Sequence, residues 1–194
     1  MKTDTRTRIL NSAWRLLEAS DGSGVRMADI AKDAGVSRQA VYLHFPTRSD
    51  LLIATTRHID TVKEIDERLT ASRTAETGVD RLDAFVDAWG NYIPEIYGVA
   101  KALLALKDTD EAAAAAWDDR MRAFRQGCHA VVQALKKDGA LSSGLPPKQA
   151  TDALWAMLSV RQWELLTSDC GWSNRQCINY TKTLARRMFV ANRR

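Results

Sequence analysis

The chain has 194 residues, of which 45% are hydrophobic and 27% are charged. This length and composition exclude a disordered chain and are typical of a globular protein with a substantial core. The formal net charge of +4 agrees with a polyanionic partner without requiring one. Residues 1–60 carry nine Lys and Arg against seven Asp and Glu, so contacts with a polyanion have to come from individually placed residues.

The sequence carries no sign of export, of a membrane span or of a metal site. Cys128, Cys170 and Cys177 lack the Cys-x-x-Cys spacing of a disulfide scaffold or a zinc site. The polar residues 1–10 have no signal-peptide core, and no segment approaches the roughly 20 apolar residues of a membrane helix. We therefore expect a cytoplasmic protein without metal, cofactor or membrane partner.

Helix-forming residues dominate between the four prolines, and no segment shows the strict alternation of a strand. The first predicted helices cover residues 4–20, 27–34 and 38–45, and a long fourth helix covers residues 47–71. A small, polar segment at 71–74 follows. Further helices are predicted over 78–93, from there to 106 after a break near Pro94, over 111–137, over 148–167 and over 173–190.

Local signals mark the ends of the first four helices. The segment Asp21-Gly22-Ser23-Gly24 predicts the end of the first helix. Gly35 predicts a tight turn after the second helix, because glycine readily takes the left-handed conformation. Ser37 and Thr47 are predicted to cap the third and fourth helices, and Pro46 separates these two.

The segment 27–45, MADIAKDAGVSRQAVYLHF, has the spacing of a helix-turn-helix. Its apolar positions can pack on Leu16 and Leu17 of the first helix, which fixes two short helices that would be unstable alone. These positions are Ile30, Ala31, Val36, Val41 and Phe45. The outward face then carries Arg38 and Gln39, which suit guanine and adenine edges, and Tyr42 and His44, which suit phosphates.

On these residues the segment from Thr5 to Leu52 resembles the DNA-binding domain of the TetR (tetracycline repressor) family. The matching stretches are TRTRIL at 5–10, DIAKDAGVS at 29–37, YLHF at 42–45 and FPTRSDLL at 45–52. The resemblance implies an all-helical homodimer that binds a pseudo-palindromic operator in double-stranded DNA and that a small-molecule effector usually releases. It also implies phosphate contacts for Tyr42, His44 and Arg48.

One position departs from the family pattern. The family usually has Ser or Thr before the second helix, where it caps the helix and touches phosphate, whereas this chain has Arg26. Loss of the cap costs about 1 kcal/mol, and we expect the cation to reach a phosphate instead. The predicted DNA-binding residues are Arg26, Ser37, Arg38, Gln39, Tyr42, His44 and Arg48.

Large aromatic residues are frequent after residue 80, and at helical spacing such residues form either plain core or a ligand pocket. The resemblance implies a cavity among the central helices, which would suit an apolar or aromatic ligand. The predicted pocket residues are Trp89, Tyr92, Trp117, Met121, Phe124 and Trp155.

The last two predicted helices carry apolar stripes that suit either packing within the chain or a dimer surface. The family geometry favours an interface of two helices from each subunit, which would set the recognition helices about 34–36 Å apart. The predicted interface residues are Leu154, Leu158, Arg161, Leu165, Ile178, Thr181, Leu184 and Met188.

Together these features predict an all-α protein. A three-helix helix-turn-helix domain at residues 1–50 is followed by a helical effector-binding and dimerisation bundle at 51–194, with the helix 47–71 as the link and the lever between them. The predicted function is that of a transcriptional regulator, most simply a repressor released by a ligand. An adaptor of the same fold without operator binding is the alternative. An enzyme is not expected, because no nucleophile-elbow, Walker or metal-ligand pattern is present.

Overall fold

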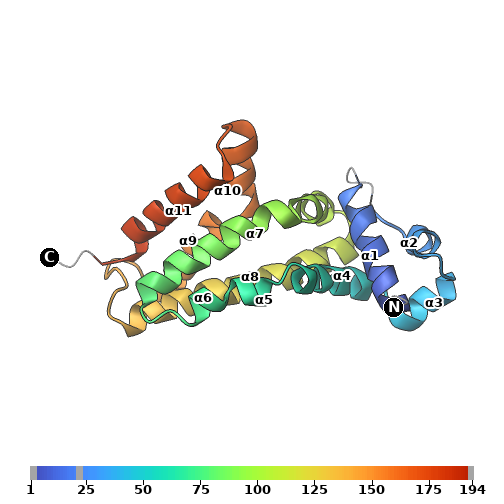
Figure 1. Ribbon diagram of the computed structural model, residues 1–194, viewed down its shortest axis with the longest axis horizontal. Coiled ribbons are helices and arrows are strands. Elements are labelled where there is room, and N and C mark those ends of the chain that lie inside the picture. The colour runs from blue at the N-terminus through green and yellow to red at the C-terminus, as the bar shows by residue number, and fades with distance from the viewer. Residues whose placement is uncertain (1–3, 21–23, 192–194) are drawn as a thin grey trace. The chain divides into compact units, whose positions relative to one another are not determined.

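The computed structural model describes residues 4–20 and 24–191, and it confirms the all-α prediction (Figure 1). Within these residues the regular elements are helices, apart from an isolated antiparallel bridge between Leu141 and Val190. None of the described helices combines the length and the apolar character needed to cross a membrane. The predicted helix end at residues 21–23 lies outside the described residues.

The chain forms two compact units, each built from separate segments of the sequence. The first unit contains the residues up to Lys63 together with Ile96–Met121, and the second contains Glu64–Glu95 together with Arg122–Arg194. The helix-turn-helix unit therefore includes two segments, 51–63 and 96–121, that the predicted division at residue 50 places in the second domain.

The first unit begins with four helices, α1 (Thr5–Glu18), α2 (Met27–Ala34), α3 (Arg38–His44) and α4 (Arg48–Val62). Helix α1 packs on both α2 and α4, and α2 packs on α3 (Figure 1). Their buried side chains share one core with apolar residues of the segment 96–121. Among the shared core residues are Ile9, Leu17, Ile30, Val41, Leu51, Leu103 and Ala113.

The second unit has its own core. This unit contains the short helices α5 (Ile65–Arg68) and α6 (Thr70–Arg73) and the C-terminal elements. The C-terminal elements are α9 (Pro147–Met157), α10 (Val160–Glu164), the π-helical turn η1 (Leu165–Asp169) and α11 (Asn174–Phe189). Buried residues of this core include Leu82, Val86, Cys128, Leu135, Leu154, Ala185 and Phe189.

Two long helices contribute residues to both units. Helix α7 covers Gly78–Leu106 and helix α8 covers Glu111–Lys137. The predicted break near Pro94 is wrong, because α7 continues through this proline. A proline inside a helix removes one backbone hydrogen bond, and the buried residues Tyr92, Ile93 and Val99 on either side of Pro94 hold the helix in place through their packing.

Two other predicted helices are interrupted. The helix predicted over 47–71 ends at Val62, and Glu64 takes a left-handed conformation with φ of 56° before α5 begins. The helix predicted over 148–167 divides at Leu158, and Ser159 caps a new helix through a hydrogen bond from the Gln162 amide. Neither break has a proline or glycine, the residues that most strongly mark a helix end in a sequence.

Candidate nucleic-acid interface

The turn between α2 and α3 has the geometry of a helix-turn-helix. Gly35 ends α2 in the left-handed region with φ of 64°, as the sequence predicts, and the amide of Val36 donates to the Ala31 carbonyl at 3.0 Å. Ser37 then caps α3, since its Oγ accepts from the Ala40 amide at 3.1 Å. The guanidinium of Arg8 donates to the carbonyls of Ala34 and Gly35, a contact that the sequence pattern did not indicate.

Helix α3 is attached to the unit through one buried side chain. Val41 is fully buried, and Phe45 directly after the helix is buried as well. The opposite face is open to solvent along the whole helix. The exposed residues are Arg38, Gln39, Tyr42, Leu43 and His44. Exposure of these residues satisfies the condition for reading base edges from this helix.

Leu43 is a residue that the sequence analysis did not select. Its side chain is 79% exposed, the largest exposure among the large hydrophobic residues of the described chain. An exposed leucine is not unusual by itself, but this one lies between Tyr42 and His44 on the predicted recognition helix. Apolar side chains at such positions contact the methyl group of thymine.

Arg26 occupies the position before α2, and its side chain makes no capping hydrogen bond, as expected for this residue type. Its Nε donates to Oδ2 of Asp29 at 2.8 Å, and the Arg26 side chain is exposed while Asp29 is partly buried. This hydrogen bond lowers the pKa of the Asp29 carboxyl. A phosphate would therefore compete with Asp29 for the Arg26 guanidinium.

Arg48, for which a phosphate contact is predicted, makes its contacts inside the first unit, and the phosphate contact stays a prediction. The Arg48 Nε donates to the Val25 carbonyl at 2.7 Å, and Nη1 lies 2.7 Å from both carboxylate oxygens of Asp110. The side chains of Arg48 and Asp110 are only 26% and 19% exposed. The guanidinium is thus directed into the unit, where three acceptors already hold it.

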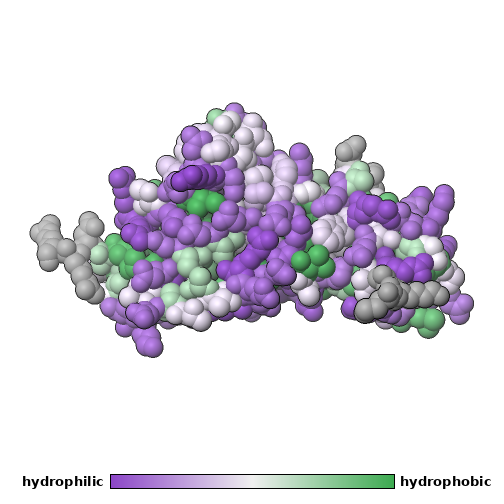
Figure 2. All heavy atoms as spheres, viewed as in Figure 1, coloured by the Kyte–Doolittle hydropathy of each residue, from purple (hydrophilic) through white to green (hydrophobic). Residues whose placement is uncertain are grey.

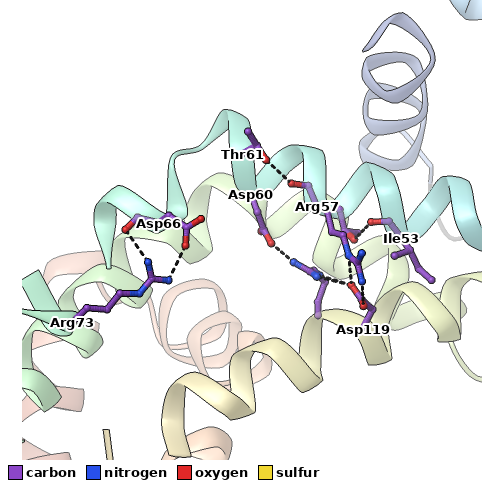
Figure 3. A network of polar contacts seen from close by, with 9 residues as sticks. Ile53, Arg57, Asp60, Thr61, Asp66, Arg73 and Asp119 are labelled. Atoms are coloured by element: carbon purple, nitrogen blue, oxygen red, sulfur yellow. Dashed lines mark hydrogen bonds and ion pairs between the residues drawn. The ribbon is translucent and has the colours of Figure 1, made fainter. Parts of the chain in front are cut away.

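A second charged cluster joins α4 to α8 (Figure 3). Asp119 accepts from Arg57, with Nη2 2.6 Å from Oδ1, and it also accepts from its neighbour Arg120. Arg120 in turn pairs with Asp60 of α4. Hydrogen bonds from Arg57 and then from Arg120 outweigh the effect of burial and lower the pKa of the Asp119 carboxyl to about 2. Asp119 is therefore ionised at any physiological pH and holds both guanidiniums.

The predicted pocket residues are divided between the two units. Trp117 and Met121 belong to the first unit, and the other four belong to the second. Trp89 stacks on Phe124 with ring centroids 4.0 Å apart, and its Nε1 donates to the Leu158 carbonyl at 2.6 Å. Their role in binding a ligand remains a prediction.

The second unit does contain a small hollow at the division between α9 and α10. Its cavity volume is about 20 Å³, which is room for about one water molecule. Its lining is largely apolar and carries no charged side chain. The lining residues are Val86, Gly90, Ile93, Met157, Leu158, Ser159, Gln162, Trp163, Cys177, Ile178 and Thr181.

The predicted dimer residues divide into two groups. Four of them are buried within the chain's own core and have no surface to offer a partner, namely Leu154, Leu158, Ile178 and Thr181. Arg161, Leu165 and Met188 are exposed, and Leu184 is half-buried. Only these four residues have surface available for an interface.

Known proteins match the chain in two different ways. The family model described as bacterial regulatory proteins of the tetR family matches residues 9–55. The nucleoid occlusion factor SlmA of Marinomonas sp. is 42% identical over 50 residues, which cover 26% of this chain and 25% of that protein. The chain thus aligns with only a quarter of the length of SlmA.

Other matches extend through most of the chain. The HTH-type transcriptional regulator EthR of Mycobacterium tuberculosis is 25% identical over 156 residues, covering 78% of this chain and 70% of that protein. A transcriptional regulator from Saccharomonospora viridis, crystallised in complex with choline, superimposes with a TM-score of 0.73 at 21% identity, covering 96% of this chain and 98% of that one. Residues 9–55 of the chain are thus similar to the tetR family of bacterial regulatory proteins, and most of the chain is similar to HTH-type transcriptional regulators.

Proposed function

We propose that this transcriptional regulator binds a pseudo-palindromic operator in double-stranded DNA as a homodimer and represses transcription until a small molecule releases it. The observation that carries the proposal is the placement of α3. Val41 anchors this helix in the core, and the side chains on its outer face are free for a major groove. Such a protein acts in the cytoplasm, where the DNA is.

Within this proposal each exposed side chain of α3 has a chemical role. Arg38 pairs with a guanine edge and Gln39 with an adenine edge, while Leu43 contacts a thymine methyl group. Tyr42 and His44 contact phosphates and fix the register of the helix, as does the capping residue Ser37 at its start. Arg26 adds a phosphate contact by exchanging Asp29 for the DNA backbone.

The second unit supports the effector part of the proposal. Its core contains stacked aromatic rings of Phe85, Trp89 and Phe124, and aromatic residues line most ligand sites. The choline complex of the Saccharomonospora viridis protein is a precedent for a small ligand on this fold. An effector that bound at the hollow would have to displace part of its lining, because the hollow has room for about one water molecule.

The operator part is tested by selecting DNA fragments from a genomic library and measuring their binding in gel shifts over a range of salt concentrations. We expect Arg38→Ala and Gln39→Ala each to weaken binding about tenfold or more and to relax the choice of one base pair, because a bidentate base contact is worth about 1–3 kcal/mol. Arg26→Ala should instead reduce the salt dependence by about one phosphate contact.

The adaptor alternative makes the opposite prediction for the same measurement. A protein that has kept the fold without binding DNA gives no fragment enrichment and no salt-dependent shift. Lys32→Ala is a suitable control, because Lys32 is an exposed cation on α2 outside the predicted contact set. Equal losses for Lys32→Ala and Gln39→Ala would contradict base reading by α3.

A further inference from the structure

A single guanidinium joins the starts of three helices in the first unit. Arg48 is the first residue of α4, and its side chain binds the carbonyl of Val25, two residues before α2 begins, and the carboxylate of Asp110, directly before α8. The planar fork of arginine suits this arrangement because it presents several donors in a fixed geometry. The contact therefore connects the helix-turn-helix to a segment 62 residues further along the chain.

Asp110 also caps α8. Its Oδ1 accepts from the amides of Ala112 and Ala113 at 3.0 and 3.1 Å. Burial opposes ionisation of this carboxyl, but the hydrogen bonds from Arg48 and from the two amides outweigh burial and keep its pKa below the ordinary value. Without Arg48, the half-buried charge of Asp110 would have only the two amides of the helix cap as partners. An incompletely paired buried charge lowers the stability of the folded protein.

The cluster around Asp119 supplies a second point of attachment between the same two helices (Figure 3). Arg57 lies nine residues after Arg48 on α4, and Asp119 lies nine residues after Asp110 along α8. The two helices therefore run in the same direction, with attachment points about 13 Å apart along the axis. Two separated points fix the direction of a helix, whereas one point would leave it free to pivot.

We propose that Arg48 is a positioning residue for operator binding, which acts through Asp110 and the Val25 carbonyl to hold α2 and α4, and with them α3, in the orientation that fits the major groove. The inference rests on the proposed function. It differs from a phosphate contact by Arg48, because the guanidinium would have to give up three acceptors to reach the DNA.

The experiment compares Asp110→Asn and Arg48→Lys with the full-length parent chain in gel shifts at several salt concentrations. Asparagine keeps the capping oxygen of Asp110 and loses its charge, and lysine keeps the charge of Arg48 and loses the fork. We expect each variant to weaken operator binding about tenfold without changing the salt slope. The double variant should be no weaker than the single ones, because both remove the same contact.

A phosphate contact by Arg48 predicts a different set of results. Asp110→Asn would then free the guanidinium and leave binding unchanged or tighter, and Arg48→Ala would lower the salt slope by about 0.9. Either result overturns the positioning role. Asp33→Asn is the matched control, since it breaks the pair between Arg15 and Asp33 in the same unit, in which the Arg15 side chain is 66% exposed, and should change affinity by less than about twofold.

Thermal melts establish that each variant is folded, and if Asp110→Asn does not fold, the salt slopes of Arg48→Lys and Arg48→Ala decide. An unchanged slope for Arg48→Ala together with weaker binding supports the positioning role. Absence of salt-dependent DNA binding by the parent chain would overturn the proposed function and this inference with it. Parent binding that Asp110→Asn leaves intact would overturn this inference alone.

Discussion

His58 is a titratable residue inside the DNA-binding unit. Its Nε2 lies 2.8 Å from Oδ1 of Asn11, which connects α4 to α1. Burial and then the positive charge of Arg6 lower the pKa of this imidazole below its ordinary value. The folded protein therefore favours the neutral ring, and it binds fewer protons at this site than the unfolded chain does.

The sign of the pH effect follows from this difference. Because the folded-state pKa lies below the unfolded value, stability is complete above pH 6.5 and falls as the pH decreases through the two pKa values. Between pH 7.5 and 5.5 we expect the melting temperature of the parent protein to fall more than that of His58→Gln. The difference between the two decreases should be no more than about 4 °C. Glutamine keeps a partner for Asn11, and His44 and His129 are present in both proteins. Parallel pH curves for the two proteins would contradict this assignment.

At the same scale, the sequence predicted the residues whose surroundings are local and missed those whose partners are distant. Gly35, Ser37 and the exposed face of α3 follow from turn, cap and spacing rules that act over a few residues. Arg48 was assigned to phosphate because of its place in the motif. Its actual partner, Asp110, lies 62 residues away, and no local pattern marks such a pair.

The interrupted helices pose the same problem at the scale of elements. The segment after Arg48 contains no proline or glycine up to residue 71, so local rules predict one helix over it. In the structure the helix stops at Val62, and Glu64 takes a left-handed conformation. After this break, ion pairs from Arg68 to Glu95 and from Arg73 to Asp66 hold the short helices α5 and α6 in the second unit.

The conformation of Glu64 can be tested through stability. A left-handed conformation costs a non-glycine residue about 1–2 kcal/mol, so Glu64→Gly should raise the melting temperature by about 2–4 °C. The matched control is Glu67→Gly, which places glycine within α5 and should lower it by a similar amount, because glycine disfavours a helix interior by about 1 kcal/mol. A decrease for both variants, measured by circular dichroism, would contradict the break at Glu64.

The break also changes the predicted lever. A helix that ends at Val62 cannot carry a movement along its axis beyond this residue. Helix α8 has residues in both units and contains no proline or left-handed residue. Asp110 and Asp119, which hold α4, lie at its start and in its third turn.

At the scale of the whole molecule, the proposed homodimer needs an apolar surface on the second unit. The hydrophobic side chains on the face shown in Figure 2 lie in small separate areas among polar ones. Among the residues predicted for the interface, Leu165 and Met188 are 56% and 41% exposed. These two residues are the natural starting point for a test of association.

We expect Leu165→Glu and Met188→Glu each to shift the protein from dimer to monomer in light scattering at micromolar concentration, because an unpaired carboxylate in an apolar interface is costly. Val62→Glu is the control, since Val62 is also an exposed apolar residue, at 49%, but belongs to the first unit. A dimer that survives both substitutions would place the interface elsewhere, and a parent chain that is monomeric would refute the dimer itself.

The interleaving of the two units limits how this regulator can be recombined with others. A hybrid that transplants only the residues before Lys63 separates Arg48 and Arg57 from their carboxylate partners. It also exposes the core of this unit, to which Leu103 and Ala113 contribute. A functional graft has to carry the segment 96–121 as well. The exchangeable module for operator specificity is therefore assembled from two pieces of sequence, and shuffling at a single crossover point would separate them.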